Sequence, residues 1–393
     1  MEAKANKTRS AGTQNIIVFS LLFVGLLSCC LALLSQEIQH DVSVINIEVP
    51  VRVFEGETFV NNLSIGQFEL FEDGILQKIA AVYLVRKTNI QKKEETRTQF
   101  SPEVSRHFVL AFEVQEYLPK IGDAVDYFFD SVIVPGDTLH VVTPVKTYNF
   151  KGEALGWMPK EKISSQLKEK LRRDIDLGNS EYRSLMKSLE DIFIFEVEDD
   201  LKQHMYLETA RKLRDLKYVD KQKLVGFADF LKDIKGQKYV FLFYQKELIP
   251  LLPGLADFSL LELKKDVSFD IDTIRRAFSD SSISVHFLFI TNKPGMHDNL
   301  ETERMAPLRV ELFDQSDSIF SAFKEVASAT GGISDSSTNA AASFQKAVEA
   351  SENYYLIYYS PQDYKPDGKY REIKVNVKGQ DYRITHRAGY FAH

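Results

Sequence analysis

The chain has 393 residues, of which 44% are hydrophobic and 27% are charged, and its formal net charge is -7. This apolar content excludes a chain that is disordered throughout. The acidic balance argues against a nucleic-acid-binding protein, which would carry a basic surface. Because the two cysteines, Cys29 and Cys30, are adjacent near the N-terminus, the rest of the chain has no disulfide, thiolate nucleophile or cysteine-based zinc site.

The first residues have the features of an export signal. Lys4, Lys7 and Arg9 precede an uncharged apolar run from Ile16 to Leu34, and a positive segment before such a run is typical of secretory signals. The run is longer than most signal cores and nearly long enough to span a bilayer. We therefore predict that residues 1–35 are a cleaved signal peptide or a transmembrane anchor, with a lipoprotein signal ending at Cys29 as a third alternative. Each alternative places the remaining chain in the periplasm, outside the cell or on the outer side of a membrane.

A β-rich segment follows the apolar run. Apolar residues alternate at period two through residues 41–54, and Asp73-Gly74 predicts a tight turn between strands at 68–71 and 75–85. We predict an N-terminal β unit over residues 41–87. Residues 88–104 are polar and charged, which predicts a linker.

Short apolar runs then alternate with helical patterns. Strands are predicted at 108–112, 137–142, 238–244, 284–290 and 354–359, and helices at 118–132, 272–280, 319–330 and 344–351. The helix at 319–330 is expected to stop at Gly331-Gly332. This alternation is typical of an α/β fold with a doubly wound, mostly parallel sheet, which we predict for residues 105–360.

Two further segments complete the predicted organisation. Residues 151–236 are highly charged, with apolar residues at helical spacing such as Ile163, Leu167 and Leu171. They predict a helical insertion of two or three amphipathic helices packed on the sheet, with an interaction arm as the alternative. The last residues, 361–393, are predicted to form a C-terminal β hairpin from strands at 370–378 and 382–386.

Several motifs, taken in order, resemble a known family. The chain resembles bacterial exported proteins with a von Willebrand factor A-related domain, of the type abundant in acidobacteria. The likeness runs from about residue 40 to residue 393 and is weakest over 151–236. The stretches that carry it are Val60–Leu63, Phe68–Gly74, Gln77–Ile79, Ala327–Gly332, Tyr354–Pro361, Asp367–Arg371 and Arg387–Phe391.

The resemblance implies a von Willebrand factor A-like, Rossmann-like domain with a metal site at the carboxyl ends of its strands. That family site takes an Asp-x-Ser-x-Ser motif after the first strand and an Asp after the central strand, and such oxygen ligands suit Mg²⁺, Mn²⁺ or Ca²⁺. Here the corresponding positions hold Glu113, Gln115 and Tyr117, then Gln245 and Lys246. Since a bulky phenol and a cation do not suit a hard metal ion, we predict a degenerate site that binds no metal or other cofactor. The alternative is a rearranged metal site that uses Glu113, Gln115 or Glu116.

The sequence contains none of the common catalytic motifs. There is no GxSxG, HExxH or phosphate-binding loop. His286 lies within an apolar strand and is interpreted as a hydrogen-bonded core residue. The acids Glu196, Glu198, Asp199 and Asp200 are interpreted as a solvated helix start, because acids favour helix N-termini.

These observations lead to a functional hypothesis of a non-enzymatic binding or scaffold protein of the cell envelope. Its partner would be an envelope or extracellular protein or a glycan, not a nucleic acid, and it would touch the membrane only through an uncleaved N-terminal segment. Two alternatives stay open: an adhesion module that uses Mg²⁺ or Ca²⁺ to hold a partner carboxylate, and a hydrolase whose carboxylate pair meets only in space. The predicted contact face comprises loop residues that follow the strands: Glu116, Thr143, Lys146, Lys246, Glu247 and Asn292.

Overall fold

The structure is a computed structural model that describes residues 45–96, 100–152, 155, 158–216, 221–255, 259, 263–264, 270–291, 311–379 and 381–393. The run Ile16–Leu34, on which the prediction of a signal or transmembrane anchor rests, lies outside these residues. Among the helices that the structure describes, none combines the length and apolar character needed to cross a membrane.

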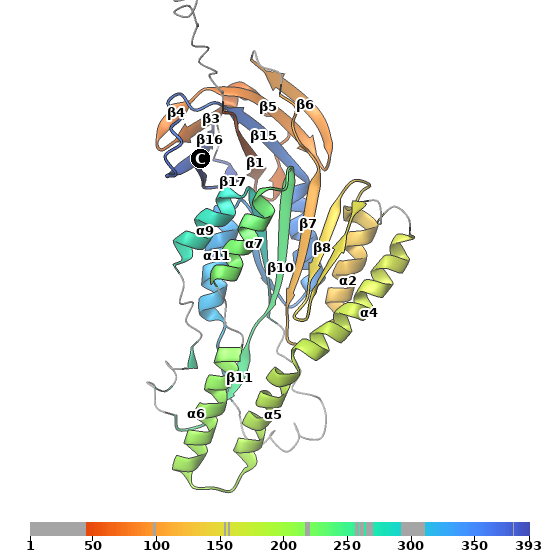
Figure 1. The fold of residues 1–393 in the computed structure, drawn as a ribbon, viewed down its shortest axis with the longest axis vertical. Coiled ribbons are helices and arrows are strands. Elements are labelled where there is room, and N and C mark those ends of the chain that lie inside the picture. Colours follow the sequence, from red (N-terminus) through yellow and green to blue (C-terminus); the bar gives the residue numbers. More distant parts are fainter. Residues whose placement is uncertain are drawn as a thin grey trace, which may run out of the picture. The chain divides into compact units, whose positions relative to one another are not determined.

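The first β layer is an antiparallel sheet assembled from distant parts of the chain (Figure 1). Its order is β17-β1-β15-β5-β6, and β2 pairs with β1. The pairings join residues about three hundred apart, for example Val49 with Ile357 and Val51 with His386. The strands are β1 (Ile47–Glu55), β2 (Thr58–Phe59), β5 (Ile79–Arg86), β6 (Asn89–Glu95), β15 (Asn353–Tyr359) and β17 (Arg383–His386).

A second antiparallel sheet shares a core with the first. Its order is β18-β16-β3-β4, and Leu70 and Val375 from it belong to the same buried cluster as Val49, Tyr355 and Ile357 from the first sheet. Period-two alternation produces this core, because it directs every second side chain to one face. The strands are β3 (Phe68–Glu72), which follows the 3-10 turn η1 (Ile65–Gln67), then β4 (Ile75–Gln77), β16 (Tyr370–Val377) and β18 (Gly389–Phe391).

All parallel strand pairs among the described residues belong to a third sheet. Its order is β14-β12-β10-β7-β8-β9, with parallel neighbours from β14 to β8 and an antiparallel pair β8-β9. The strands are β7 (Arg106–Glu113), β8 (Thr138–Val142), β9 (Thr147–Phe150), β10 (Gln237–Gln245), β12 (Ile283–Ile290) and β14 (Ser334–Ser337).

Helices pack on both faces of this third sheet. Phe108, Leu110, Phe241 and Phe243 form one buried cluster with residues of α2 (Pro119–Tyr127), the π-helical turn η2 (Phe128–Val132), α4 (Lys160–Gly178) and α12 (Ala340–Glu352). Side chains on the opposite face, such as Val109, Val240 and Phe287, contact α7 (Lys221–Lys232), α9 (Ile271–Asp280) and α11 (Asp317–Ala329).

The segment between β9 and β10 also contains a helical hairpin. Its helices α5 (Ser180–Ile194) and α6 (Asp199–Leu216) lie side by side in Figure 1. Tyr182, Leu189 and Tyr206 from the hairpin pack against Ile249, which belongs to the two-stranded antiparallel sheet of β11 (Leu248–Leu251) and β13 (Glu311–Asp314).

The predicted fold class, a doubly wound and mostly parallel α/β sheet of the von Willebrand factor A or Rossmann type, is wrong. Most strand pairings in the described residues are antiparallel, and β15, expected as the last parallel strand, pairs antiparallel with β1 and β5. A continuous apolar run indicates a strand that is buried on both faces, which is typical of parallel sheets. Here both faces are instead covered within an antiparallel sheet, by the Tyr355 cluster on one side and by Phe100 and Val104 on the other.

The flanking segments also pair differently from the expectation. Residues 89–95, within the predicted linker, form the edge strand β6, whose charged and largely exposed side chains suit an edge. In the C-terminal segment, β16 pairs with β3 and β18, while β17 pairs with β1, so the two strands of the predicted hairpin bond to other strands.

Candidate functional site

The positions at which the resemblance implied a metal site are held together by two glutamine side chains. Gln115, after β7, and Gln245, at the end of β10, are both buried. The backbone N–H groups of Gln115 and Glu116 donate to Gln245 Oε1 over 2.9 and 3.3 Å, and Gln115 Nε2 donates to the Gln245 carbonyl over 3.2 Å. The Gln245 oxygen that a cation would need is thus already engaged by two backbone donors.

The neighbouring residues do not fit a hard cation either. Lys246 forms an ion pair with Asp314, 3.0 Å away, and the Arg172 guanidinium lies 5.0 Å from the centre of the Tyr117 ring. Burial raises the pKa of Tyr117, which keeps its phenol protonated. Among the described residues, no group of three or more His, Cys, Asp or Glu side chains is arranged to hold a metal ion.

The predicted contact face is partly buried. The Thr143 hydroxyl lies 2.9 Å from the Lys146 carbonyl and 3.1 Å from Asp174. Glu247 is also buried, and it accepts a 2.6 Å hydrogen bond from the Tyr244 hydroxyl. Neither side chain can therefore face a partner.

The other members of the predicted face have more exposed positions. Glu116 is half-buried, Lys246 keeps 30% of its side chain exposed, and Lys146 is exposed with its ammonium group 4.9 Å from the centre of the Tyr148 ring. Asn292 lies outside the described residues. The structure thus brings only a reduced set of the predicted residues to the surface.

The helical hairpin covers part of this region. Tyr206 on α6 donates a 2.8 Å hydrogen bond to the Pro250 carbonyl in β11, next to the end of β10. Burial is also the main reason that the pKa of Tyr182 on α5 is raised, with further contributions from Glu247 and Glu116. The hairpin and β11 therefore take up space near the strand ends where a partner was expected to bind.

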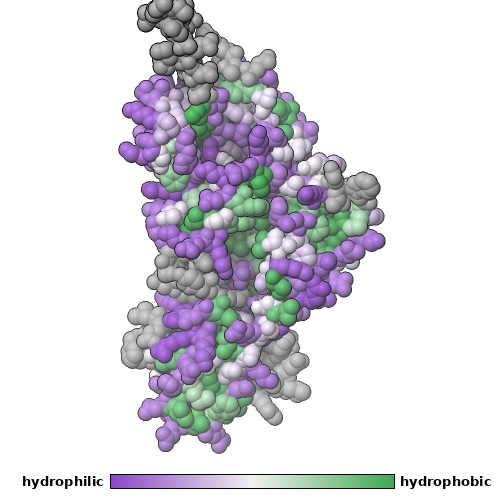
Figure 2. All heavy atoms as spheres, viewed as in Figure 1, coloured by the Kyte–Doolittle hydropathy of each residue, from purple (hydrophilic) through white to green (hydrophobic). Residues whose placement is uncertain are grey.

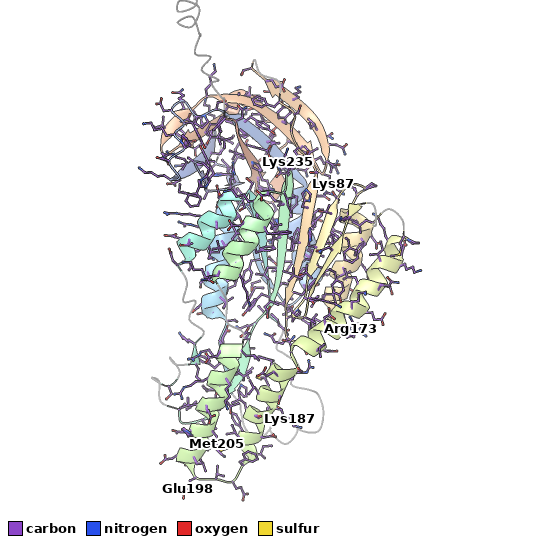
Figure 3. All side chains as sticks on the ribbon, in the orientation of Figure 1. Lys87, Arg173, Lys187, Glu198, Met205 and Lys235 are labelled. Atoms are coloured by element: carbon purple, nitrogen blue, oxygen red, sulfur yellow. The ribbon has the colours of Figure 1, made fainter. Side chains whose placement is uncertain are left out.

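The turn of the same hairpin carries exposed apolar side chains. Figure 3 places Glu198 at the tip, beyond Lys187 and Met205. Around it, the exposed fractions are 58% for Ile194, 46% for Phe195, 38% for Val197 and 50% for Leu201. We define residues 194–201 as the hairpin tip. Figure 2 shows hydrophobic and hydrophilic residues mixed over the hairpin at the lower end of the view.

Sequence reasoning did not single out the hairpin tip, although it raised an interaction arm in this segment. The run Ile192–Phe195 reads as a continuation of the helical core stripe. In the structure Ile192 is buried and the Phe193 ring packs 6.3 Å from Tyr206, while Ile194 and Phe195 point outward because α5 ends between them. The one available signal was that the apolar run is longer than a single helix face requires.

Comparisons with known proteins leave the family of this chain open. No protein-family model matches the sequence, and no curated protein matches it. Among solved structures, the chain is similar to the crystal structure of the human COPII-coat protein Sec24c, with 7% sequence identity and a TM-score of 0.29. The similarity covers 74% of this chain and 44% of the Sec24c chain, so this chain spans less than half of that protein. A likeness this weak carries no argument about fold or function.

Proposed function

We propose that this chain is an exported, non-enzymatic binding or scaffold protein of the cell envelope. Export follows from the positive segment and the apolar run within residues 1–35. The observation that supports binding is the hairpin tip, where Ile194, Phe195, Val197 and Leu201 expose apolar surface at one place. Contiguous exposed apolar side chains surrounded by polar ones often mark a protein interaction site.

The charge around the tip favours one kind of partner. From Glu190 to Leu201 the sequence contains six carboxylates and no Lys or Arg. A complementary partner would present basic side chains around an apolar groove, because opposite charges guide two surfaces together and fix their register. The same carboxylates would be repelled by an anionic lipid surface, so a protein partner fits better than a membrane.

The proposal predicts that polar substitutions at the tip abolish partner binding. In the variant that combines Phe195→Ser and Leu201→Ser, we expect capture of a specific envelope protein by the immobilised chain to be lost. Once that protein is purified, the Kd of its complex with the variant should be about tenfold or more higher than with the unmodified chain, since buried interface anchors each contribute more than about 1 kcal/mol. Capture should also weaken as the salt concentration rises.

A matched control is Phe230→Ser, because Phe230 is 60% exposed on α7, away from the tip. Retained binding in the control together with loss in the tip variant supports the proposal, and equal binding by both variants contradicts it. Capture that disappears with a chelator would instead favour the metal-dependent adhesion alternative.

A further inference from the structure

A cavity of about 550 Å³ lies on one face of the third sheet. Its floor comes from β7, β8, β10 and β12, and its walls from α7, α9, α11 and the end of the α4–α5 connection. The volume falls within the range of small-molecule sites, which are concave and mostly apolar with a few polar groups. Most of the lining is apolar, including Leu224, Phe227, Phe278, Phe323 and Val326.

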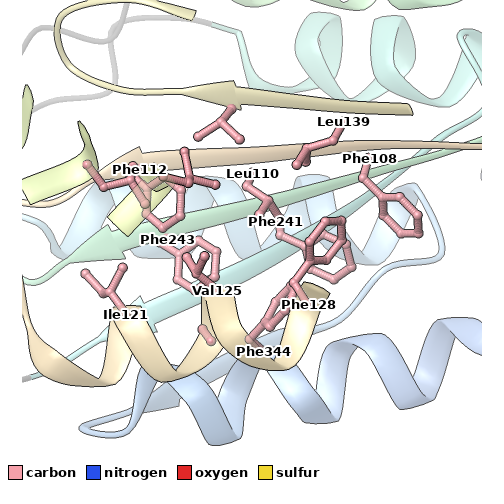
Figure 4. Close-up of a cluster of buried hydrophobic side chains, with 14 of the residues drawn as sticks. Phe108, Leu110, Phe112, Ile121, Val125, Phe128, Leu139, Phe241, Phe243 and Phe344 are labelled. Carbon is pink, nitrogen blue, oxygen red and sulfur yellow. The ribbon is translucent and has the colours of Figure 1, made fainter. Parts of the chain in front are cut away.

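Part of the floor of this cavity is uncovered although it lies on central strands. Ala111 on β7 and Leu242 on β10 are partners across the sheet and remain partly exposed. Their chain neighbours Phe112 and Phe243 point to the opposite face, where both are buried and stack with ring centres 4.7 Å apart. Figure 4 shows that opposite face filled by aromatic and aliphatic side chains. Because the Ala111 side chain is small, space remains on the cavity side of the sheet, whereas packed side chains fill the opposite face.

Strand register arranges the cavity floor from apolar to polar. Val240 and Val285 are partners at one level, and Leu242 and Ala111 are partners at the next. The third level pairs Tyr244 with Glu113 at the carboxyl ends of the strands. Successive levels are two residues apart, so the floor extends over roughly 13 Å.

The polar end offers acceptors of hydrogen bonds. The Tyr244 hydroxyl donates to Glu247, which leaves lone pairs on its oxygen that can accept a further bond, and Glu113 contributes a carboxylate. Lys223, the cation among the lining residues, is exposed on α7, where water screens the interactions of its charge. An acceptor-rich end favours a head group that donates hydrogen bonds and disfavours an anion.

We propose that this cavity binds an amphipathic small molecule, with its apolar body over Val240, Val285 and Leu242 and a hydroxyl or amine head at Tyr244 and Glu113. This inference is independent of the protein partner proposed for the hairpin tip. It places a small-molecule site on the sheet face, near the strand ends but away from the tip.

Two related dyes test the proposal directly. Phenylnaphthylamine is a neutral amine, and anilinonaphthalene sulfonate has the same aromatic skeleton with an added anionic group. We expect the neutral dye to bind the intact exported chain with a rise in fluorescence, and to bind at least about tenfold more tightly than the sulfonated dye. Ala111→Phe, which fills the floor, should weaken the neutral dye about tenfold or more. Leu242→Trp serves the same purpose if the first variant does not fold.

Three further variants separate this site from other surfaces. Glu113→Gln should narrow the difference between the two dyes, because it removes the negative charge without changing the side-chain shape. Phe230→Ser on α7 and Phe195→Ser at the hairpin tip should leave dye binding unchanged. The proposal is overturned if folded Ala111→Phe and Leu242→Trp chains bind the neutral dye as the unmodified chain does, or if the sulfonated dye binds as tightly as the neutral one. Loss of dye binding in Phe195→Ser would move the dye site to the tip.

Discussion

At the scale of single residues, Gln245 shows how one buried side chain can join two strand ends. It is fully buried, and its oxygen accepts hydrogen bonds from two successive backbone N–H groups, those of Gln115 and Glu116. Its Nε2 donates to Glu116 Oε1 over 3.3 Å. The side chain thus fastens the chain after β7 to the end of β10.

We predict that Gln245→Ala lowers the free energy of unfolding by about 2 to 4 kcal/mol, because two backbone donors, one of them buried, lose their acceptor. Lys246→Ala is the adjacent control. Its ion pair with Asp314 is about 30% exposed on both sides, so its loss should cost less than about 1 kcal/mol. Urea unfolding of both variants measures the difference, and similar losses in the two would contradict the role given to Gln245.

At the scale of elements, the C-terminal strands belong to the same structure as the N-terminal ones. β17 pairs with β1 and β16 pairs with β3, while Ile373, Val375 and Tyr390 enter the core shared by both antiparallel sheets. The Arg387 guanidinium also donates to the Glu48 carbonyl over 2.6 Å. The last strands therefore complete the N-terminal β layer.

Removal of residues 361–393 should abolish cooperative unfolding. Burial of each large apolar side chain contributes about 1.5 to 3 kcal/mol, and three of them approach the whole stability of an ordinary domain. Thermal unfolding followed by circular dichroism checks this expectation. As a control, a short Gly-Ser insertion between Lys378 and Tyr382 keeps every strand and should change stability little. A truncated chain that melts cooperatively at the original temperature would show that the C-terminal strands are dispensable.

At the scale of the whole molecule, buried polar groups connect the antiparallel layer to the third sheet. Arg52 on β1 donates to the Gly331 carbonyl over 3.1 Å and lies 3.4 Å from Ser284 Oγ on β12. Nearby, the fully buried His286 accepts a hydrogen bond from the Ile333 backbone N–H at Nδ1, and its Nε2 lies 2.9 Å from Ser351 Oγ. Burial, together with the Arg52 charge, lowers the pKa of His286 from 6.5 to about 3.

The low pKa of His286 makes stability depend on acidity. Between pH 6.5 and pH 3 the unfolded chain binds a proton that the folded chain excludes. The free energy of unfolding should therefore fall as the pH is lowered, by up to about 1.4 kcal/mol per pH unit from this residue. Glu48 acts in the opposite sense, because burial raises its pKa and the stability it contributes is lost as the pH rises. Urea unfolding at several pH values in this range measures how the free energy of unfolding changes with pH. This pH dependence should be smaller in His286→Gln, and an unchanged pH dependence would refute the assignment.

The sequence alone determined the local features of this protein. The turn at Asp73-Gly74 is confirmed by positive φ values of 49° and 80°, and α11 ends at Ala329, just before the predicted stop at Gly331-Gly332. The interpretation of His286 as a hydrogen-bonded core residue is also confirmed. Turns and helix ends depend on residues that are close in the chain, and burial depends on the apolar character of each residue. Both can be read from the amino-acid sequence.

The tertiary structure decided which strands pair and what surrounds each site. The apolar run of β15 fits a parallel or an antiparallel neighbour equally well, and only the distant segments β1 and β5 fix its direction. In the same way, Gln115 and Gln245 meet because β7 and β10 are adjacent in register, and Ala111 lies over a cavity because of the helices packed around it. These outcomes depend on contacts between residues far apart in sequence. The free energies of such contacts cannot be inferred from the local sequence pattern.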